Sequence, residues 1–205
     1  MKCVIVCGAT ILDYEKAASY IEKEDFVIAC DSGLYHTKAL GVEPDLIVGD
    51  FDSHPKPDTK GEIIELPREK DDTDSVFALK EGIKRGFEDF LFLGALGKRF
   101  DHGFVNVSSL LMLDSMGKKG MIVDDYCEME VISSEAYVSE TYPYFSLLNI
   151  SGEKNDISIS GAKFPLNHKE ITPEYQYGVS NEVLPKETAH IVVHKGRILL
   201  VRDFD

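Results

Sequence analysis

The stretch PDLIVGDFDS, residues 44–53, runs an apolar segment into Gly49 and then sets Asp50 and Asp52 one residue apart. A short apolar run that ends at a glycine is typical of a buried strand followed by a turn. In extended backbone, residues i and i+2 point to the same side, so both carboxylates could reach one ion while Phe51 packs inward. This spacing suits a hard cation such as Mg²⁺, whose ligands are oxygen atoms.

The same arrangement recurs through the first 125 residues. Short apolar runs at 3–8, 26–30, 45–49, 62–67, 89–97 and 119–125 alternate with helix-like segments at 13–22, 33–40, 74–86 and 103–116. Alternation at this spacing predicts an α/β fold, with a mostly parallel sheet and helices on both faces. In such sheets, ligands bind beyond the carboxyl ends of the strands.

The pattern changes after about Tyr126, where short alternating runs replace the helical periodicity. Such runs predict a C-terminal antiparallel β-sandwich or barrel. The stretch HIVVHKGRILLVR, residues 190–202, predicts a hairpin that turns at Lys195 and Gly196. The expected domains are therefore residues 1–125 and 126–205.

The composition restricts the partners and the compartment. The chain carries 36 Asp and Glu against 22 Lys and Arg, a formal charge of −14, which argues against nucleic acid or an anionic membrane as main partner. No apolar stretch approaches the roughly 18 residues needed to span a bilayer, and the apolar run near the N-terminus is too short for a signal peptide. The four cysteines lack CxxC or Cys/His spacing, so we expect reduced core thiols in a cytoplasmic protein.

Acidic residues recur at the ends of predicted strands and in the loop before the helix at 74–86. They are Asp31, then Asp50 and Asp52, then Asp71, Asp72 and Asp74. These loops converge on one edge of a parallel sheet, where crowded carboxylates without a cation would raise each other's pKa. The pattern therefore predicts a Mg²⁺ site that in turn holds phosphate. The competing interpretation is that these residues are turn and N-cap residues, with Asp72, Thr73 or Asp74 capping the helix.

The segment GALGKRFDHG, residues 94–103, adds a cationic group at the same edge. Gly94 and Gly97 allow tight turns or close approach to a ligand, and Arg99 could offer a bidentate fork to phosphate. Asp101 and His102 open the next helix. Alternatively, Arg99 is a solvated loop charge, Asp101 a cap and His102 a surface residue. The segment matches neither the GxGxxG nor the Walker spacing.

Taken in order, CDSG, PDLIVGDFDS, KDDTDSVFALK, GALGKRFDHGFVNVSSLL and the late GAKFPLN and YGVSNEV resemble the thiamine pyrophosphokinase family over nearly the whole chain. The resemblance implies a homodimer whose subunits each have an α/β nucleotide-binding catalytic domain and a β-sandwich domain that holds thiamine, with active sites between subunits. It also implies Mg²⁺-dependent transfer of a diphosphate from ATP to thiamine, giving thiamine diphosphate and AMP.

The resemblance further implies roles for particular residues. Those expected to hold the metal are Asp50, Asp52 and Asp74; those expected to contact ATP are Asp31, Lys70, Thr73 and Arg99. The expected catalytic residues are Asp71, Asp74, Arg99 and Asp101, with Asp71 or Asp101 as the general base. The residues expected at thiamine are Phe164, Ser180 and Asn181.

This sequence departs from the family pattern at two positions. Ser32 stands where the family commonly has glycine, which puts the geometry of that turn in question. Phe164 stands where many relatives have tryptophan, and this chain has no Trp. Alternatively, Phe164 belongs to the sandwich core and Ser180 is a turn residue. Without the resemblance, the residues predict a metal-dependent enzyme that acts on a nucleotide phosphate. The competing interpretations are a nucleotide-sugar transferase, a nucleotide hydrolase and a non-enzymatic nucleotide sensor.

Overall fold

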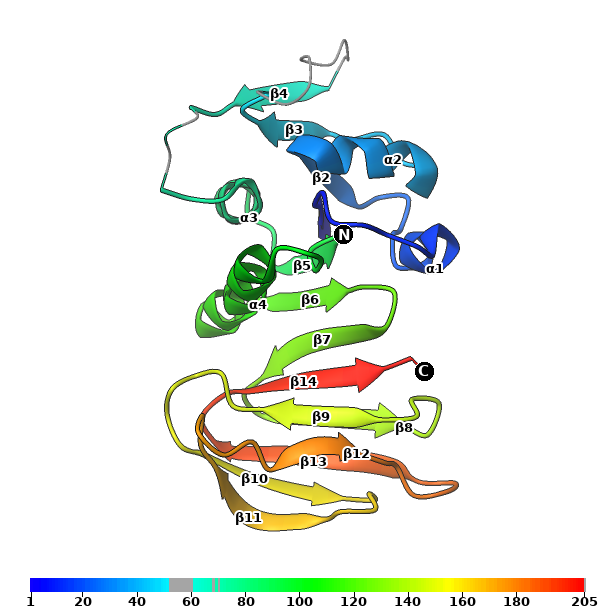
Figure 1. Cartoon of the computed structure of the whole chain (residues 1–205), viewed down its shortest axis with the longest axis vertical. Coiled ribbons are helices and arrows are strands. Elements are labelled where there is room, and N and C mark those ends of the chain that lie inside the picture. The colour runs from blue at the N-terminus through cyan, green and yellow to red at the C-terminus, as the bar shows by residue number, and fades with distance from the viewer. Residues whose placement is uncertain (52–60, 68, 70, 205) are drawn as a thin grey trace. The chain divides into compact units, whose positions relative to one another are not determined.

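The computed structural model describes residues 1–51, 61–67, 69 and 71–204 (Figure 1). It contains two compact units. The first comprises Met1–Ser109 and Gly117–Asp125, and the second comprises Leu110–Met116 and Tyr126–Asp205. Among the described residues, no helix is long and apolar enough to cross a membrane.

The first unit is built on a parallel sheet. Its strands are β1 (Cys3–Val6), β2 (Phe26–Cys30), β3 (Leu46–Gly49), β4 (Glu62–Glu65), β5 (Asp89–Leu93) and β6 (Lys119–Val123). They pair in the order β6-β5-β1-β2-β3-β4, and every pair is parallel. The predicted parallel sheet is therefore confirmed. The chain leaves β1 toward β2, whereas β5 pairs with the other edge of β1, so the loops after β1 and β5 flank a topological switch point.

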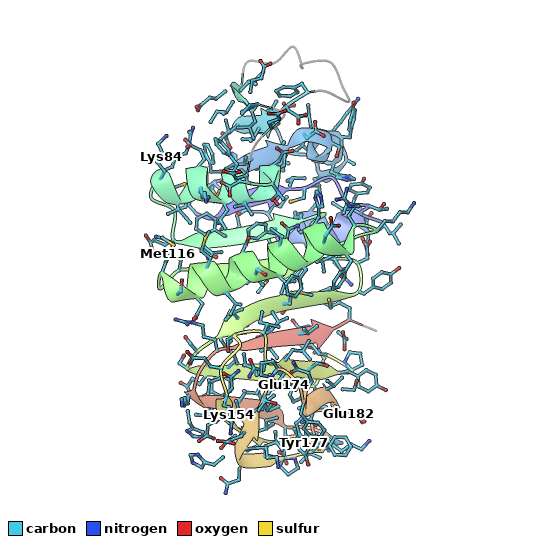
Figure 2. All side chains as sticks on the ribbon, turned by 60° about the vertical axis from the view of Figure 1, so that its left-hand side comes forward. Lys84, Met116, Lys154, Glu174, Tyr177 and Glu182 are labelled. Atoms are coloured by element: carbon cyan, nitrogen blue, oxygen red, sulfur yellow. The ribbon has the colours of Figure 1, made fainter. Side chains whose placement is uncertain are left out.

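Helices cover both faces of this sheet, as the alternation of segments predicts. They are α1 (Tyr14–Ser19), the 3-10 turn η1 (Asp31–Gly33), α2 (Leu34–Leu40), α3 (Asp74–Lys84) and α4 (Phe100–Ser115). Figure 1 shows α1 and α2 on one side of the strands and α3 on the other, and Lys84 marks the end of α3 in Figure 2. Gly82 allows α3 to lie close to the sheet, because an added Cβ would stand 2.9 Å from Cys3 Sγ and 2.8 Å from the Phe90 ring.

The cysteines of the first unit behave as core residues. Cys3, Cys7 and Cys30 are buried free thiols, whereas Cys127 in the second unit is half-buried. Burial raises the pKa of Cys3 to about 12, so this thiol stays protonated at neutral pH.

The second unit is an antiparallel sandwich. One sheet has the order β12-β9-β14-β7 and the other has the order β11-β10-β13-β8. The strands are β7 (Cys127–Ile132), β8 (Glu135–Ser139), β9 (Phe145–Leu148), β10 (Asn155–Ser160), β11 (Leu166–Ile171), β12 (Gly178–Asn181), β13 (Thr188–Lys195) and β14 (Ile198–Asp203). Side chains of both sheets share one apolar core, among them Phe145, Leu200, Ile157 and Ile191. In Figure 2, Lys154 marks the approach to β10 and Tyr177 the approach to β12.

The predicted hairpin at 190–202 is wrong. β13 pairs with β10 and β8, whereas β14 pairs with β7 and β9, so the chain crosses from one sheet to the other between them. Asn155, which is fully buried, fixes this corner because its Oδ1 accepts a hydrogen bond from Arg197 N at 3.3 Å. Gly196 has φ +88, and an added Cβ would stand 1.9 Å from Asn155 Oδ1. A lysine-glycine turn signals a change of direction but does not specify which sheet receives the next strand.

Candidate active site

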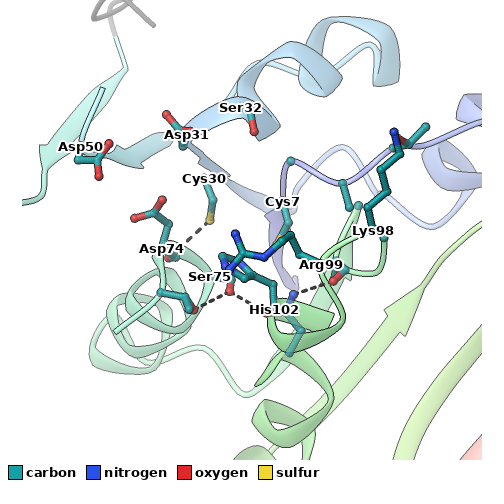
Figure 3. Close-up of a pocket in the computed structure, with 18 residues that line it drawn as sticks. Cys7, Cys30, Asp31, Ser32, Asp50, Asp74, Ser75, Lys98, Arg99 and His102 are labelled. Carbon is teal, nitrogen blue, oxygen red and sulfur yellow. Dashed lines mark hydrogen bonds between the residues drawn. The ribbon is translucent and has the colours of Figure 1, made fainter. Parts of the chain in front are cut away.

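A cavity of about 540 Å³ lies at the carboxyl ends of β1, β2, β3 and β5 and at the N-terminal ends of α3 and α4 (Figure 3). This is the position at which open α/β sheets bind ligands. The residues of the sequence prediction that line it are Asp31, Asp50, Thr73, Asp74 and Arg99. These residues come from four separate segments of the chain and meet at one cavity, as the convergence of the loops predicts.

The other predicted residues of the first unit lie elsewhere. Asp71 is exposed and does not line the cavity. Asp101 also lies outside the lining, next to Arg99. Asp52 and Lys70 fall outside the residues that the structure describes.

Two residues at the acidic edge have unusual backbone. Asp31 has φ +42 and Phe51 has φ +51, both in the left-handed region that non-glycine residues rarely occupy. Such a backbone conformation destabilises the folded state by about 1–3 kcal/mol per residue, and these conformations cluster at functional sites. Gly49 permits the close approach of the two loops, since an added Cβ would stand 3.2 Å from Asp31 Cα. The backbone thus brings the loops that carry Asp31 and Asp50 together.

The oxygen donors of this edge fit a hard cation. Figure 3 shows Asp31, Asp50 and Asp74 around the same end of the cavity. The ligand atoms of Asp31, Asp50 and Asp74 do not, however, all lie within 4.8 Å of one another. Mg²⁺ usually binds one or two carboxylates and completes its octahedron with waters and substrate phosphates. The donor set therefore suits a cation held together with a nucleotide and does not form an all-protein cage.

Ser32 fits its turn because residue 8 is glycine. An added Cβ on Gly8 would stand 1.9 Å from Ser32 Oγ, so the serine side chain occupies the space that a side chain at position 8 would need. Gly33 is packed equally tightly, because its added Cβ would stand 2.0 Å from Val6 O. The turn therefore accommodates a serine at position 32.

A hydrogen-bonded chain of polar groups, of which Ser75 and Asn106 are buried, joins the N-terminal parts of two helices. Thr73 caps α3, its Oγ1 accepting from Val76 N at 3.3 Å, and lies 3.1 Å from Ser75 Oγ. Ser75 Oγ donates to Asn106 Oδ1 at 2.7 Å, and Asn106 Nδ2 donates to Ala95 O at 2.7 Å. The chain therefore joins α3, α4 and the loop after β5 below the cavity.

Sequence reasoning missed Ser75 and Asn106. Both are buried and both line the cavity. The available signal was a polar residue on the apolar face of each helix, since buried polar side chains require partners.

Arg99 and Asp101 form a bidentate ion pair at the cavity mouth. Arg99 Nε donates to Asp101 Oδ1 at 2.9 Å, and the Nη2–Oδ2 distance is 2.6 Å. Hydrogen bonding to Arg99 holds the pKa of Asp101 well below its usual range. A carboxylate with a lowered pKa is a weak base, so the geometry suits Asp101 to orienting the guanidinium of Arg99, which lines the cavity.

The predicted thiamine residues lie in the second unit. The ring of Phe164 is 55% exposed, so the interpretation of Phe164 as a core residue is wrong. Asn181 is buried, and its amide forms hydrogen bonds with the backbone of Phe164. Ser180 has φ +53, and its N–H donates to Ser146 Oγ at 3.0 Å. Ser180 and Phe164 are thus linked through Asn181, which follows Ser180 in β12.

Comparisons with known proteins agree with this division of the chain. Residues 17–122 match the family model of the thiamin pyrophosphokinase catalytic domain, and residues 130–198 match that of the thiamin pyrophosphokinase vitamin B1 binding domain. A thiamine pyrophosphokinase of Bacillus subtilis is 24% identical over 195 residues, which cover 91% of each chain.

Solved structures show the same fold. The crystal structure of thiamine pyrophosphokinase from Bacillus subtilis has a TM-score of 0.88 and 22% identity, with both chains covered completely. That of thiamin pyrophosphokinase from Geobacillus thermodenitrificans has a TM-score of 0.85 and 25% identity, covering 100% of this chain and 98% of the other. The structure of thiamin pyrophosphokinase from Candida albicans has a TM-score of 0.78 and 16% identity, covering 100% of this chain and 89% of the other. With its two successive family domains, the chain belongs to the thiamine pyrophosphokinase family.

Proposed function

We propose that the chain transfers a diphosphate group from ATP to the hydroxyethyl group of thiamine, with Mg²⁺ as the cation, giving thiamine diphosphate and AMP. The observation that carries this proposal is the cavity at the switch point of the sheet, where Asp31, Asp50 and Asp74 face Arg99 in a member of this family. Carboxylates opposite a guanidinium suit a nucleotide whose phosphates are partly neutralised by a cation.

Each group of the cavity has a proposed role. Asp50 and Asp74, with Asp52, would hold Mg²⁺, which when bound neutralises charge on the phosphate oxygens, and Asp31 would contact ATP. Arg99, kept in one orientation by Asp101, would stabilise negative charge as it develops on the transferred group. Thr73 presents the N-terminus of α3 to the cavity, where backbone N–H groups favour anions. Lys70 is proposed as a further phosphate contact.

The proposed reaction is an in-line displacement. The hydroxyl oxygen of thiamine forms a bond to the β-phosphorus of ATP, and the bond from that phosphorus to the oxygen bridging the α-phosphorus breaks. The electron pair of the broken bond leaves with AMP, and the hydroxyl proton goes to a base. Catalysis of such transfers depends mainly on positioning and charge stabilisation. Asp71 remains the proposed base, because the carboxylate of Asp101 is held by Arg99; Asp71 lies outside the cavity lining but only three residues before Asp74, which lines it.

We propose that residues of the second unit bind thiamine. An exposed aromatic ring at Phe164 offers a flat apolar surface to the pyrimidine of thiamine, and Ser180 offers a hydroxyl. We also propose that the enzyme acts as a cytoplasmic homodimer. Phe100 and Phe104, which are both exposed and have ring centroids 6.0 Å apart on α4, give a second copy apolar surface to cover.

One assay separates this function from its competitors. The protein is incubated with ATP and Mg²⁺, with and without thiamine, and AMP is measured. AMP that appears only with thiamine supports the diphosphate transfer. AMP release that does not need thiamine would indicate a nucleotide hydrolase. If no AMP forms, a separate measurement of ATP binding is needed, and binding without turnover would indicate a nucleotide sensor.

A further inference from the structure

A cluster of two histidines and one aspartate lies on the outer face of the sheet β11-β10-β13-β8. The potential ligand atoms of Asp156, His168 and His194 all lie within 4.8 Å of one another. Asp156 Oδ2 is 3.2 Å from His168 Nδ1, and the two imidazole rings stack with centroids 3.9 Å apart. These three residues, here called the His168 cluster, have no part in the proposed transfer reaction.

We propose that the His168 cluster binds a divalent transition metal ion of the zinc type. Two imidazoles and one carboxylate form a ligand set that suits Zn²⁺, Co²⁺, Ni²⁺ or Cu²⁺, whereas Mg²⁺ prefers oxygen ligands alone. Ligand atoms sharing one zinc ion lie roughly 3.3 Å apart, given Zn–N bonds of about 2.1 Å. To share one ion, the ligand atoms must approach one another while the two stacked rings turn apart. The side chain of His168, which is 60% exposed, has room for this movement.

Irregular strand pairing brings these side chains together, and the first irregularity lies in β13. In the pairing of β10 with β13, Asp156 faces Lys195 and Ile157 faces Val193. His194 is therefore an extra residue in β13, a β-bulge. Bulges redirect side chains and are typical of functional positions in sheets.

A second bulge lies in β11, which pairs with the other edge of β10. The register of the β10–β11 pairing shifts between Ile157 and Ile159, so that Asn167 and His168 lie opposite Ser158. His168 also has φ +45, a left-handed conformation that costs about 1–3 kcal/mol in a non-glycine residue. Both histidines thus come from irregular positions on the two strands that flank β10.

Ser158 orients the histidines in the way that outer partners orient metal ligands. Its Oγ lies 2.8 Å from His194 Nε2 and accepts a hydrogen bond from His168 N at 3.0 Å. Metal-binding histidines commonly have the second ring nitrogen held by such a partner, which leaves the first one directed at the ion. One nitrogen of His194 is therefore fixed while the other remains available as a ligand.

One oxygen of the cluster has no partner. Among the buried side-chain nitrogen and oxygen atoms of the described residues, Asp156 Oδ1 makes no hydrogen bond. Leaving such an oxygen unsatisfied costs about 1–3 kcal/mol. A bound cation would satisfy this oxygen, which gives the carboxylate a reason to lie beside the two stacked histidines.

Two nearby lysines are engaged elsewhere, whereas Lys195, which faces Asp156 in the β10–β13 pairing, forms no ion pair with it at 4.0 Å or less. Lys154 Nζ lies 3.3 Å from Glu170 Oε2, and Lys169 Nζ lies 4.7 Å from the centroid of the Tyr177 ring. Among the described residues, Asp156 has no ion pair with a lysine or arginine at 4.0 Å or less. The carboxylate is therefore not already neutralised by a basic side chain.

The test is zinc binding by the full chain in excess Mg²⁺, measured by competition with a chromophoric chelator. We expect one Zn²⁺ per chain at micromolar affinity or tighter. His168→Ala and His194→Ala should each weaken binding at least about a hundredfold, since removing even an outer partner of a metal ligand costs 10–100-fold. Asp156→Asn, which preserves the shape of the side chain, should also weaken it.

His190→Ala is the matched control. His190 lies on the same outer face, but its Nε2 pairs with Glu135 at 2.9 Å and its ring stacks on Tyr137 at 4.5 Å. This variant should bind zinc as the wild type does. A visible Co²⁺ spectrum with nitrogen ligands, and a zinc-dependent rise in Tm, should accompany binding and disappear in His168→Ala. Wild-type binding weaker than micromolar, or equal affinity in the wild type and both cluster variants, would overturn the proposal without affecting the diphosphate transfer.

Discussion

The side chain of Asn181 holds the backbone of Phe164 at both of its polar groups. Phe164 N donates to Asn181 Oδ1 at 3.0 Å, and Asn181 Nδ2 donates to Phe164 O at 2.9 Å. Asn181 is 3% exposed, whereas the Phe164 ring is 55% exposed. A buried amide on β12 therefore presents an exposed aromatic ring, and Asn181 is a positioning residue for Phe164.

This relationship predicts that the two residues act on the same kinetic constant. Phe164→Ala should raise the KM for thiamine about tenfold, equivalent to about 1.4 kcal/mol, with little change in the KM for ATP. Asn181→Ala should raise the same constant by a similar factor, because the ring loses its fixed position. In the double variant the effects should not add. An unchanged KM for thiamine in Phe164→Ala would remove the ring from the substrate site.

Gly8 and Ser32 give a second prediction. Gly8→Ala places a methyl group where Ser32 Oγ now lies, at 1.9 Å, so the turn at the cavity must shift. Overpacking of this kind costs about 1–3 kcal/mol, and the lower value is expected because the hydroxyl can rotate. The KM for ATP should rise in Gly8→Ala and return toward the wild-type value in Gly8→Ala with Ser32→Gly. Failure of Ser32→Gly to restore it would show that the two residues do not share this space.

The buried chain through Ser75 predicts a loss of stability. Ser75→Ala leaves Asn106 Oδ1 without its donor, which should lower the free energy of unfolding in urea by about 1–3 kcal/mol. Ser108→Ala on the same helix as Asn106 is the control, because Ser108 Oγ donates only to Phe104 O, at 2.9 Å. Equal stability of the two variants would argue against a structural role for the chain.

His36 predicts a pH dependence of stability. Burial lowers the pKa of His36, whose Nδ1 lies 2.7 Å from the Tyr14 hydroxyl. As pH falls below the usual value of about 6.5, the unfolded chain binds a proton before the folded chain does, so stability is present above that pH and is lost below it. The wild type should therefore lose more stability than His36→Gln between pH 7 and pH 5, measured by thermal unfolding. Parallel curves would place the lost stability in other groups.

Much of the first unit could be predicted because its signal is local. Apolar runs and helical periodicity identified the strands and helices, and the rule that carboxyl ends of parallel strands share an edge brought Asp31, Asp50 and Asp74 to one cavity. The path from β13 to β14 could not be predicted, because a turn sequence does not reveal which sheet will pair with the next strand. Asn155, more than 40 residues away, holds that corner.

The site was predicted less completely than the fold. Ser75 and Asn106 were missed because their role depends on the packing of α3 against α4, which a single sequence does not display. The role of Asn181 as a support for Phe164 likewise requires knowledge that β12 lies beside the loop that carries the ring. Asp52 and Lys70 lie outside the described residues, so their roles remain predictions.

The most direct test of the central claim compares Asp74→Asn with Asp72→Asn. Asp74 lines the cavity, whereas Asp72, two residues earlier, lies outside it and pairs with Lys80 at 2.6 Å. We predict that thiamine-dependent AMP release at saturating Mg²⁺ falls at least about a hundredfold in Asp74→Asn and stays near the wild-type rate in Asp72→Asn. AMP release by Asp74→Asn at the wild-type rate would contradict the proposal that the carboxylates of this cavity handle the phosphates of ATP.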